Sequence, residues 1–188
     1  WCYVGLVEVE RAYREWDVVL EWAPFFLDPS IPPEGRTRTP TTTADTPPSA
    51  MELRAETLGI KFARGRTFQP HTHRALEAGE WVSEHGNPEQ VLEYHRRLFR
   101  AHFTDHESLM DLDVLVREAT ATGLDGAALR ADLESGGLIE AVDEGISPVG
   151  RGSGRGVASG GVRRFRRVGD GAPREATGEV SAWPPGGR

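Results

Sequence analysis

The sequence predicts an α/β domain in which helices dominate. An amphipathic helix at the start of the chain leads directly into a segment, 17–27, that is rich in β-branched and aromatic residues and is typical of a buried strand. Residues 50–145 then show helical spacing that glycine, proline and aspartate interrupt at regular intervals. The 188 residues, of which 38% are hydrophobic, suffice for one domain with a real core.

The first helix is predicted from Leu6, Val9 and Tyr13, which recur at steps of three and four residues. Its opposite side is polar and carries Glu8, Glu10, Arg11 and Arg14. Cys2, the single cysteine, therefore lies at a helix N-terminus, where unpaired backbone N–H groups and the helix dipole favour a thiolate over a thiol. A thiolate is the nucleophile of disulfide exchange, whereas a lone cysteine is otherwise commonly a small buried apolar residue.

The segment after the strand is predicted to be an exposed connector without helix or sheet. Residues 28–50 include six prolines and the run Thr41–Thr43. Proline interrupts both kinds of regular structure because it lacks a backbone N–H group.

The region from 50 to 145 is predicted to form five or six helices. The first covers 51–58, and the next begins at Thr72, a candidate N-cap, and carries Ala75, Ala78 and Val82 on one face. Further helices are expected from Pro88, over 109–121, from Asp125 to Leu133 and from 136 to a stop at Gly145. The helix from Pro88 has an apolar stripe made of Val91, His95, Leu98, Phe99, His102 and Phe103.

The tail has a different composition. Residues 148–188 contain 11 of the 22 glycines, and their eight arginines against three acidic residues give a net charge of +5. Residues 1–147 therefore carry a net charge of −12, because the whole chain has a net charge of −7. We find no strand or helix period in the tail and expect no packed core there.

Four segments together resemble one family. Trp1-Cys2-Tyr3-Val4-Gly5 before Glu10-Arg11-Ala12 is similar to the second half of a Cys-Pro-Trp-Cys-Tyr-x-Gly motif. Trp22-Ala23-Pro24-Phe25-Phe26-Leu27, His71–Leu76 and Gly123-Leu124-Asp125 are similar to three later segments of the same proteins. These are the DsbA-family, FrnE-like oxidoreductases of thioredoxin fold, which insert a helical lid into that fold.

The resemblance implies a fold class of α/β, thioredoxin-like, with a large α-helical insertion. It implies a partial thioredoxin-like half over 1–35, a connector over 36–50, the insertion over 51–135, a return helix over 136–147 and the tail over 148–188. The first Cys and the Pro of the motif would precede Trp1, so we expect the chain to be incomplete at both ends. After residue 147 the expected Gly-Val-Pro and two hairpin strands are missing. Three explanations stay open for the tail, namely a disordered segment, an unusual strand-rich end and a frameshift, and we favour the frameshift.

The resemblance also implies an activity, thiol–disulfide exchange on a protein or small-molecule thiol or disulfide, with no cofactor. Cys2 would be the catalytic residue that resolves the mixed disulfide formed at the first thiol. A glutathione-dependent isomerase of the same fold, which usually has Ser where Cys2 lies, and a non-catalytic helical interaction protein remain alternatives. The chain shows no export signal and no apolar run of membrane-spanning length, so we expect a cytoplasmic location.

Two other kinds of site are weighed against this interpretation. The pairs His71/His73 and His102/His106 have spacings that metal sites use, but His102 shares the apolar stripe, which favours packed histidines over a metal. The net charge of −7 argues against nucleic acid and anionic membrane as partners, although the run 163–167 is basic around Phe165.

Overall fold

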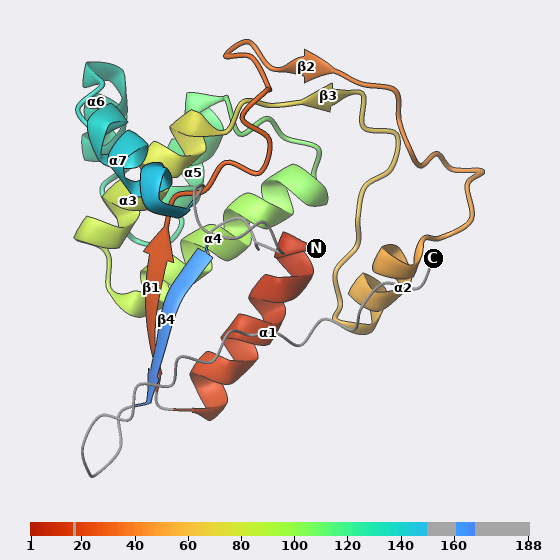
Figure 1. Cartoon of the computed structure of the whole chain (residues 1–188), viewed down its shortest axis with the longest axis horizontal. Helices are drawn as coiled ribbons and strands as arrows, with labels where there is room; N and C mark the ends of the chain where they lie inside the picture. The colour runs from red at the N-terminus through yellow and green to blue at the C-terminus, as the bar shows by residue number, and fades with distance from the viewer. Residues whose placement is uncertain (17, 150–160, 168–188) are drawn as a thin grey trace.

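The computed structural model describes residues 1–16, 18–149 and 161–167. The described chain is a mixed α/β structure dominated by helices, as the sequence predicts (Figure 1). Its elements in order are α1 (Cys2–Glu15), β1 (Val18–Ala23), β2 (Arg36–Thr37), α2 (Ala50–Thr57), β3 (Phe68–Gln69), α3 (His73–His85), α4 (Pro88–Phe103), α5 (Leu112–Thr120), α6 (Gly126–Ser135), α7 (Ile139–Val149) and β4 (Gly161–Arg167).

Local capping fixes where several helices begin. Ser49 and Asn87 each form a capping box, with Glu52 and Gln90 as the respective reciprocal partners, and Pro88 occupies the first turn of α4. The Asp125 carboxylate accepts hydrogen bonds from the backbone N–H groups of Ala127 and Ala128 and caps α6, as predicted.

Thr72 takes the N-cap position of α3 as predicted, but its side chain accepts no capping hydrogen bond.

The larger core lies among the helices that follow the connector. It combines α3, α4, α5 and α6 around Tyr94, Leu115, Leu129 and Leu133, whose exposure does not exceed 1%. Trp22 of β1 packs against this cluster from outside. The predicted buried face of α3 is confirmed, because Ala75, Ala78 and Val82 are all buried.

A second cluster joins α1, α2 and the far side of α4. Its buried members are Tyr3, Val4, Ala55 and Ile60, and Phe62, Phe99 and Phe103 pack against them. In Figure 1, α4 runs through the middle of the molecule with α1 alongside it. Helix α4 therefore serves two cores, and this position brings the start of α1 against the helical region.

The buried side of α1 differs from the predicted one. Tyr3, Val4 and Leu6 are buried, whereas Val9 and Tyr13 are only half-buried. Glu10, predicted on the polar side, faces α4 and lies 3.8 Å from Arg96, and burial raises the pKa of its carboxyl group. The contact with α4 thus covers part of the side that the sequence pattern marks as polar.

Strand β1 is shorter than predicted and ends at Ala23, because Pro24 has no N–H group to continue a ladder. It pairs antiparallel with β4, and a bulge between Leu20 and Trp22 takes up an extra residue, so Phe165 stands opposite Leu20 and Val162 opposite Trp22. The prediction of a tail without regular structure is therefore wrong at residues 161–167, which form β4. Backbone pairing does not require apolar and polar residues to alternate along the strand. Residues 150–160 and 168–188 of the tail lie outside the described part of the chain.

Two other boundaries need correction. The connector contains β2, which pairs with β3 through Arg36↔Gln69 and Thr37↔Phe68. Helix α7 does not stop at Gly145 but continues to Val149. A Cβ atom at Gly145 would lie 2.6 Å from Cγ of Pro24, so this glycine permits close packing instead of ending the helix.

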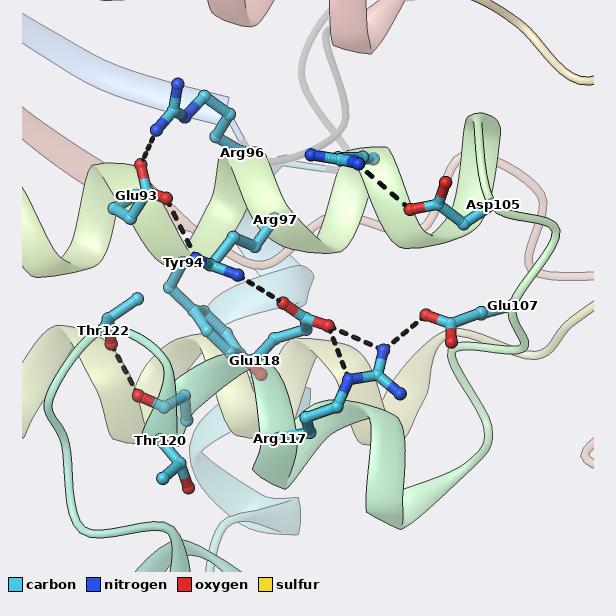
Figure 2. Close-up of polar contacts among 12 residues, drawn as sticks. Glu93, Tyr94, Arg96, Arg97, Asp105, Glu107, Arg117, Glu118, Thr120 and Thr122 are labelled. Carbon is cyan, nitrogen blue, oxygen red and sulfur yellow. Dashed lines mark hydrogen bonds and ion pairs between the residues drawn. The ribbon is translucent and has the colours of Figure 1, made fainter.

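An ion-pair network connects α4 with α5 (Figure 2). Glu118, 7% exposed, accepts from Arg97 of α4 at 3.1 Å and from Nε of Arg117 at 2.9 Å. Arg97 also pairs with Glu93, and Arg117 with Glu107. Glu118 is therefore the buried centre of a network whose outer members are partly exposed.

We expect Glu118→Gln to lower the free energy of unfolding by about 1–3 kcal/mol, since both arginines lose their shared carboxylate. Urea unfolding of the two proteins would measure the change. Glu107→Gln is the matched control, because it removes a more exposed carboxylate from the same Arg117 and should cost less than about 1 kcal/mol. Equal losses in the two variants would contradict a special role for the buried carboxylate.

Candidate active site around Cys2

Cys2 is the first residue of α1, as the sequence predicts. Trp1 is the N-cap residue, and its carbonyl accepts the first helical hydrogen bond, from Gly5 N at 2.8 Å. Trp1 supplies no side-chain cap, and the first turn of α1 contains no acidic residue. The thiol is partly exposed. It therefore lies where backbone N–H groups stabilise negative charge, and where a disulfide in solution has access to it.

The residue after Cys2 fixes this position. The Tyr3 ring stacks on Phe99 at a centroid distance of 5.8 Å and meets Phe62 edge-on at 6.3 Å. Phe103 lies 6.3 Å from the same ring. Because α4 and the segment after α2 both hold Tyr3, the helix start and Cys2 are anchored to the helical region.

A pocket of about 180 Å³ opens beside Trp1. Apolar side chains of Met51, Phe62 and Phe103 form part of its wall. The polar part of its wall comes from Arg38, Thr41, Thr42, Ser49, Glu52 and Arg66. The pocket thus combines aromatic surface with two guanidinium groups next to the residue that precedes Cys2.

Arg66 is held by α4. Its guanidinium donates to Nε2 and to the backbone carbonyl of His102, and its Cζ atom lies 5.2 Å from the centre of the Phe103 ring. Nε2 of His102 must accept, so the proton is on Nδ1, which lies 3.4 Å from the Glu107 carbonyl oxygen. Burial first, and the adjacent Arg66 second, lower the pKa of His102 to about 4, so this histidine is neutral near pH 7.

Sequence reasoning missed Arg38 and Arg66 as parts of this site. They are 36 and 64 residues from Cys2 along the chain, and no motif marks them. Arg38 lies within the predicted connector, and Arg66 lies between the two helices predicted over 51–58 and from Thr72, so neither was marked as a site residue. The pairing of β2 with β3, and the hydrogen bond from Arg38 N to Thr67 O at 2.8 Å, bring both arginines to one place.

The histidine pairs do not form a metal centre. Among the described residues, no group of three or more His, Cys, Asp or Glu side chains is placed to hold a metal ion. His73 instead contacts Glu77 at 2.7 Å and Asp143 at 3.2 Å, and Phe26 packs against both His71 and His73. His95 stacks on Trp22 at 3.9 Å, so packing explains it, although its Nε2 is buried without a partner in the described part of the chain.

Two further expectations concern the C-terminal side and membranes. Pro148, which follows the point where the family resemblance leads us to expect Gly-Val-Pro, lies within α7. No helix in the described ranges is long and apolar enough to cross a bilayer.

Comparison with known proteins agrees with the sequence resemblance. The family model for the DSBA-like thioredoxin domain matches residues 1–156. The chain is 30% identical to the uncharacterized protein YwbO of Bacillus subtilis (strain 168) over 135 aligned residues. The alignment covers 71% of this chain and 66% of that protein. The chain therefore spans about two thirds of that relative's length. With a family match over most of its length, the chain belongs to the DSBA-like thioredoxin domain family.

Proposed function

We propose that this protein takes part in thiol–disulfide exchange and that Cys2 is the second, resolving thiol of the site. The observation that supports this most is the position of Cys2, the only cysteine, as the first residue of α1 in a chain that matches the DSBA-like domain. A glutathione-dependent isomerase is the weaker candidate, because Ser usually occupies this position there. The cytoplasmic location stays a prediction from the sequence.

The proposed reaction begins at a first thiol two positions before Trp1, in a Cys-Pro-Trp-Cys arrangement. That thiolate attacks one sulfur of a substrate disulfide, the substrate S–S bond breaks, and one substrate thiolate leaves. The Cys2 thiolate then attacks the first cysteine of the mixed disulfide. The second substrate thiolate leaves and takes a proton from water, so two enzyme thiols are oxidised as one substrate disulfide is reduced.

Three features of the described structure support Cys2 in this role. Cys2 is the first residue of α1, the residue is partly exposed, and Tyr3 packs the start of the helix against α4. By itself the Cys2 thiolate exchanges only once with a disulfide and remains as a mixed disulfide, because the described chain offers no second cysteine.

The test compares residues 1–188 with the same chain carrying Cys-Pro before Trp1. We expect residues 1–188 to form a mixed disulfide with a small disulfide, seen as a mass increase, but to show no turnover in insulin reduction. The Cys-Pro addition should restore turnover, and Cys2→Ser in that protein should trap the mixed disulfide. Turnover by residues 1–188 alone would refute the resolving role, and an inert Cys2 in both proteins would refute the proposed function.

A further inference from the structure

The pocket beside Trp1 contains two cations that no carboxylate neutralises. Neither Arg38 nor Arg66 forms an ion pair with an acidic side chain of residues 1–16, 18–149 or 161–167. Among the described residues, the only side chain that accepts a hydrogen bond from Arg38 is Thr41, through its hydroxyl at 3.2 Å. Most other arginines in the helical region do pair with carboxylates, including Arg64, Arg97 and Arg117. This pair is therefore an exception.

Glu52, the acidic residue in the pocket wall, is already hydrogen-bonded to Ser49 and Arg64. Oε2 of Glu52 accepts from the backbone N and the hydroxyl of Ser49, each at 2.8 Å, and Oε1 accepts from Nε of Arg64 at 2.8 Å. These bonds lower the pKa of Glu52 and keep it ionised, with Arg64 as its counter-ion. Two positive charges in the pocket are left over.

Arg66 has donors to spare. A guanidinium carries five N–H groups, and the two contacts to His102 occupy two of them. Burial and the nearby charge of Arg38 lower the pKa of Arg66, so the cation is partly desolvated and repelled by its neighbour. A bound anion would relieve both costs, and a planar carboxylate matches the remaining N–H groups.

The size and position of the pocket limit the ligand. A volume of about 180 Å³ is smaller than a site for a whole drug-sized ligand, so it holds one arm of a molecule. Trp1 lines the pocket and is joined by a trans peptide to Cys2, whose Cα is therefore about 3.8 Å away along the chain. The pocket therefore lies next to the start of the helix that carries Cys2.

We propose that this pocket is an anion subsite that binds the carboxylate arm of a small disulfide, the substrate of the redox site that includes Cys2. The inference rests on the proposed function, because it assigns the substrate class of the same site. Arg38 and Arg66 are the specificity residues, and His102 acts on the substrate only through Arg66, as a positioning residue.

The first experiment measures the rate at which Cys2 forms a mixed disulfide with three small probes of different charge. The anionic probe is 3,3′-dithiodipropionate, the neutral probe is bis(2-hydroxyethyl) disulfide and the cationic probe is cystamine. Each rate with Cys2 is divided by the rate at which the same probe reacts with a small neutral thiol in solution, which removes differences in intrinsic reactivity. In every case the Cys2 thiolate attacks one probe sulfur, the probe S–S bond breaks, and one probe thiolate leaves. We expect the anionic probe to react about tenfold faster than the neutral one at low salt, and the cationic probe to be slowest.

Variants locate the effect. Arg38→Gln and Arg66→Gln should each remove most of the preference for the anionic probe over the neutral probe. Arg54→Gln is the matched control, since it changes the net charge equally but pairs with Glu8 outside the pocket. High salt should reduce the preference in the wild type. A preference that survives both pocket variants, or equal rates for all three probes, would overturn the subsite.

A second measurement does not need the thiol. In Cys2→Ser, titration with 3,3′-dithiodipropionate should shift the side-chain Nε–H resonance of Arg66 in ¹H–¹⁵N NMR spectra. That resonance is assigned as the one missing from the spectrum of Arg66→Gln. No shift at millimolar probe would contradict the subsite. Failure of all three probes to modify Cys2, together with a clear shift of Arg66, would instead refute the proposed function and leave anion binding supported.

Discussion

Lowering the pH from 7 to 4 is expected to reduce the free energy of unfolding by several kcal/mol through His95 and His102. Burial lowers the pKa of His95 to about 4, and burial with Arg66 lowers that of His102 to about 4. In the unfolded chain both titrate near the ordinary value of 6.5. The unfolded state therefore binds more protons than the folded state between about pH 6.5 and 4.

The sign follows from this difference. A depressed histidine pKa contributes no penalty above pH 6.5, and the penalty grows as the pH falls to about 4 and then stays constant. A shift of this size corresponds to about 2–4 kcal/mol for each histidine. Glu52, whose pKa is lowered by Ser49, adds to the loss only at the acid end, where carboxylates begin to protonate.

Urea unfolding at a series of pH values would measure this effect, with a slope near two protons between pH 6 and 4.5. His95→Phe keeps an aromatic ring against Trp22 and should reduce the slope by about one proton, and it removes a buried nitrogen that lacks a partner. His106→Gln changes an exposed histidine and serves as control. A slope unchanged in His95→Phe would contradict the assigned pKa.

Tyr3→Ala is expected to lower the free energy of unfolding by about 3–5 kcal/mol, in the range of aromatic truncations in cores. Tyr3 is 8% exposed, and its ring contacts Phe62, Phe99 and Phe103. Its removal leaves a cavity where α1 meets α4. Since this contact fixes the helix start, modification of Cys2 by a neutral thiol reagent should also become faster in the variant.

The control for this prediction is Tyr3→Phe. The Tyr3 hydroxyl forms no hydrogen bond with a described residue, so Tyr3→Phe should change the stability by less than about 1 kcal/mol. Denaturant midpoints give the stability, and reagent kinetics give the access to Cys2. A Tyr3→Ala protein as stable as the wild type would show that α1 is held elsewhere.

Much of the fold could be predicted because its signals are local. Cys2 begins a helix because an amphipathic pattern starts there, and Asp125 and Pro88 mark helix starts through their own backbone and side-chain chemistry. The sequence motif around Cys2 also indicated the family that the comparison confirms.

Other features depended on partners that are distant in the sequence. Glu10 lies on a side of α1 that faces Arg96 of α4, and Gly145 lies within a helix at a place where Pro24 leaves no room for a Cβ atom. Strand β4 forms by pairing with β1, and the glycine- and arginine-rich sequence of this segment does not indicate a strand. Periodicity within a segment contains no information about such partners.

The sequence by itself determined the class, the family motif and the place of the single thiol at the start of a helix. Only the tertiary structure decided what surrounds that thiol. It brought Arg38 and Arg66 into one pocket beside Trp1 and placed a neutral His102 against Arg66. The physical reason is that capping and amphipathicity act over a few residues, whereas charge and desolvation at a site are set by side chains that folding brings together.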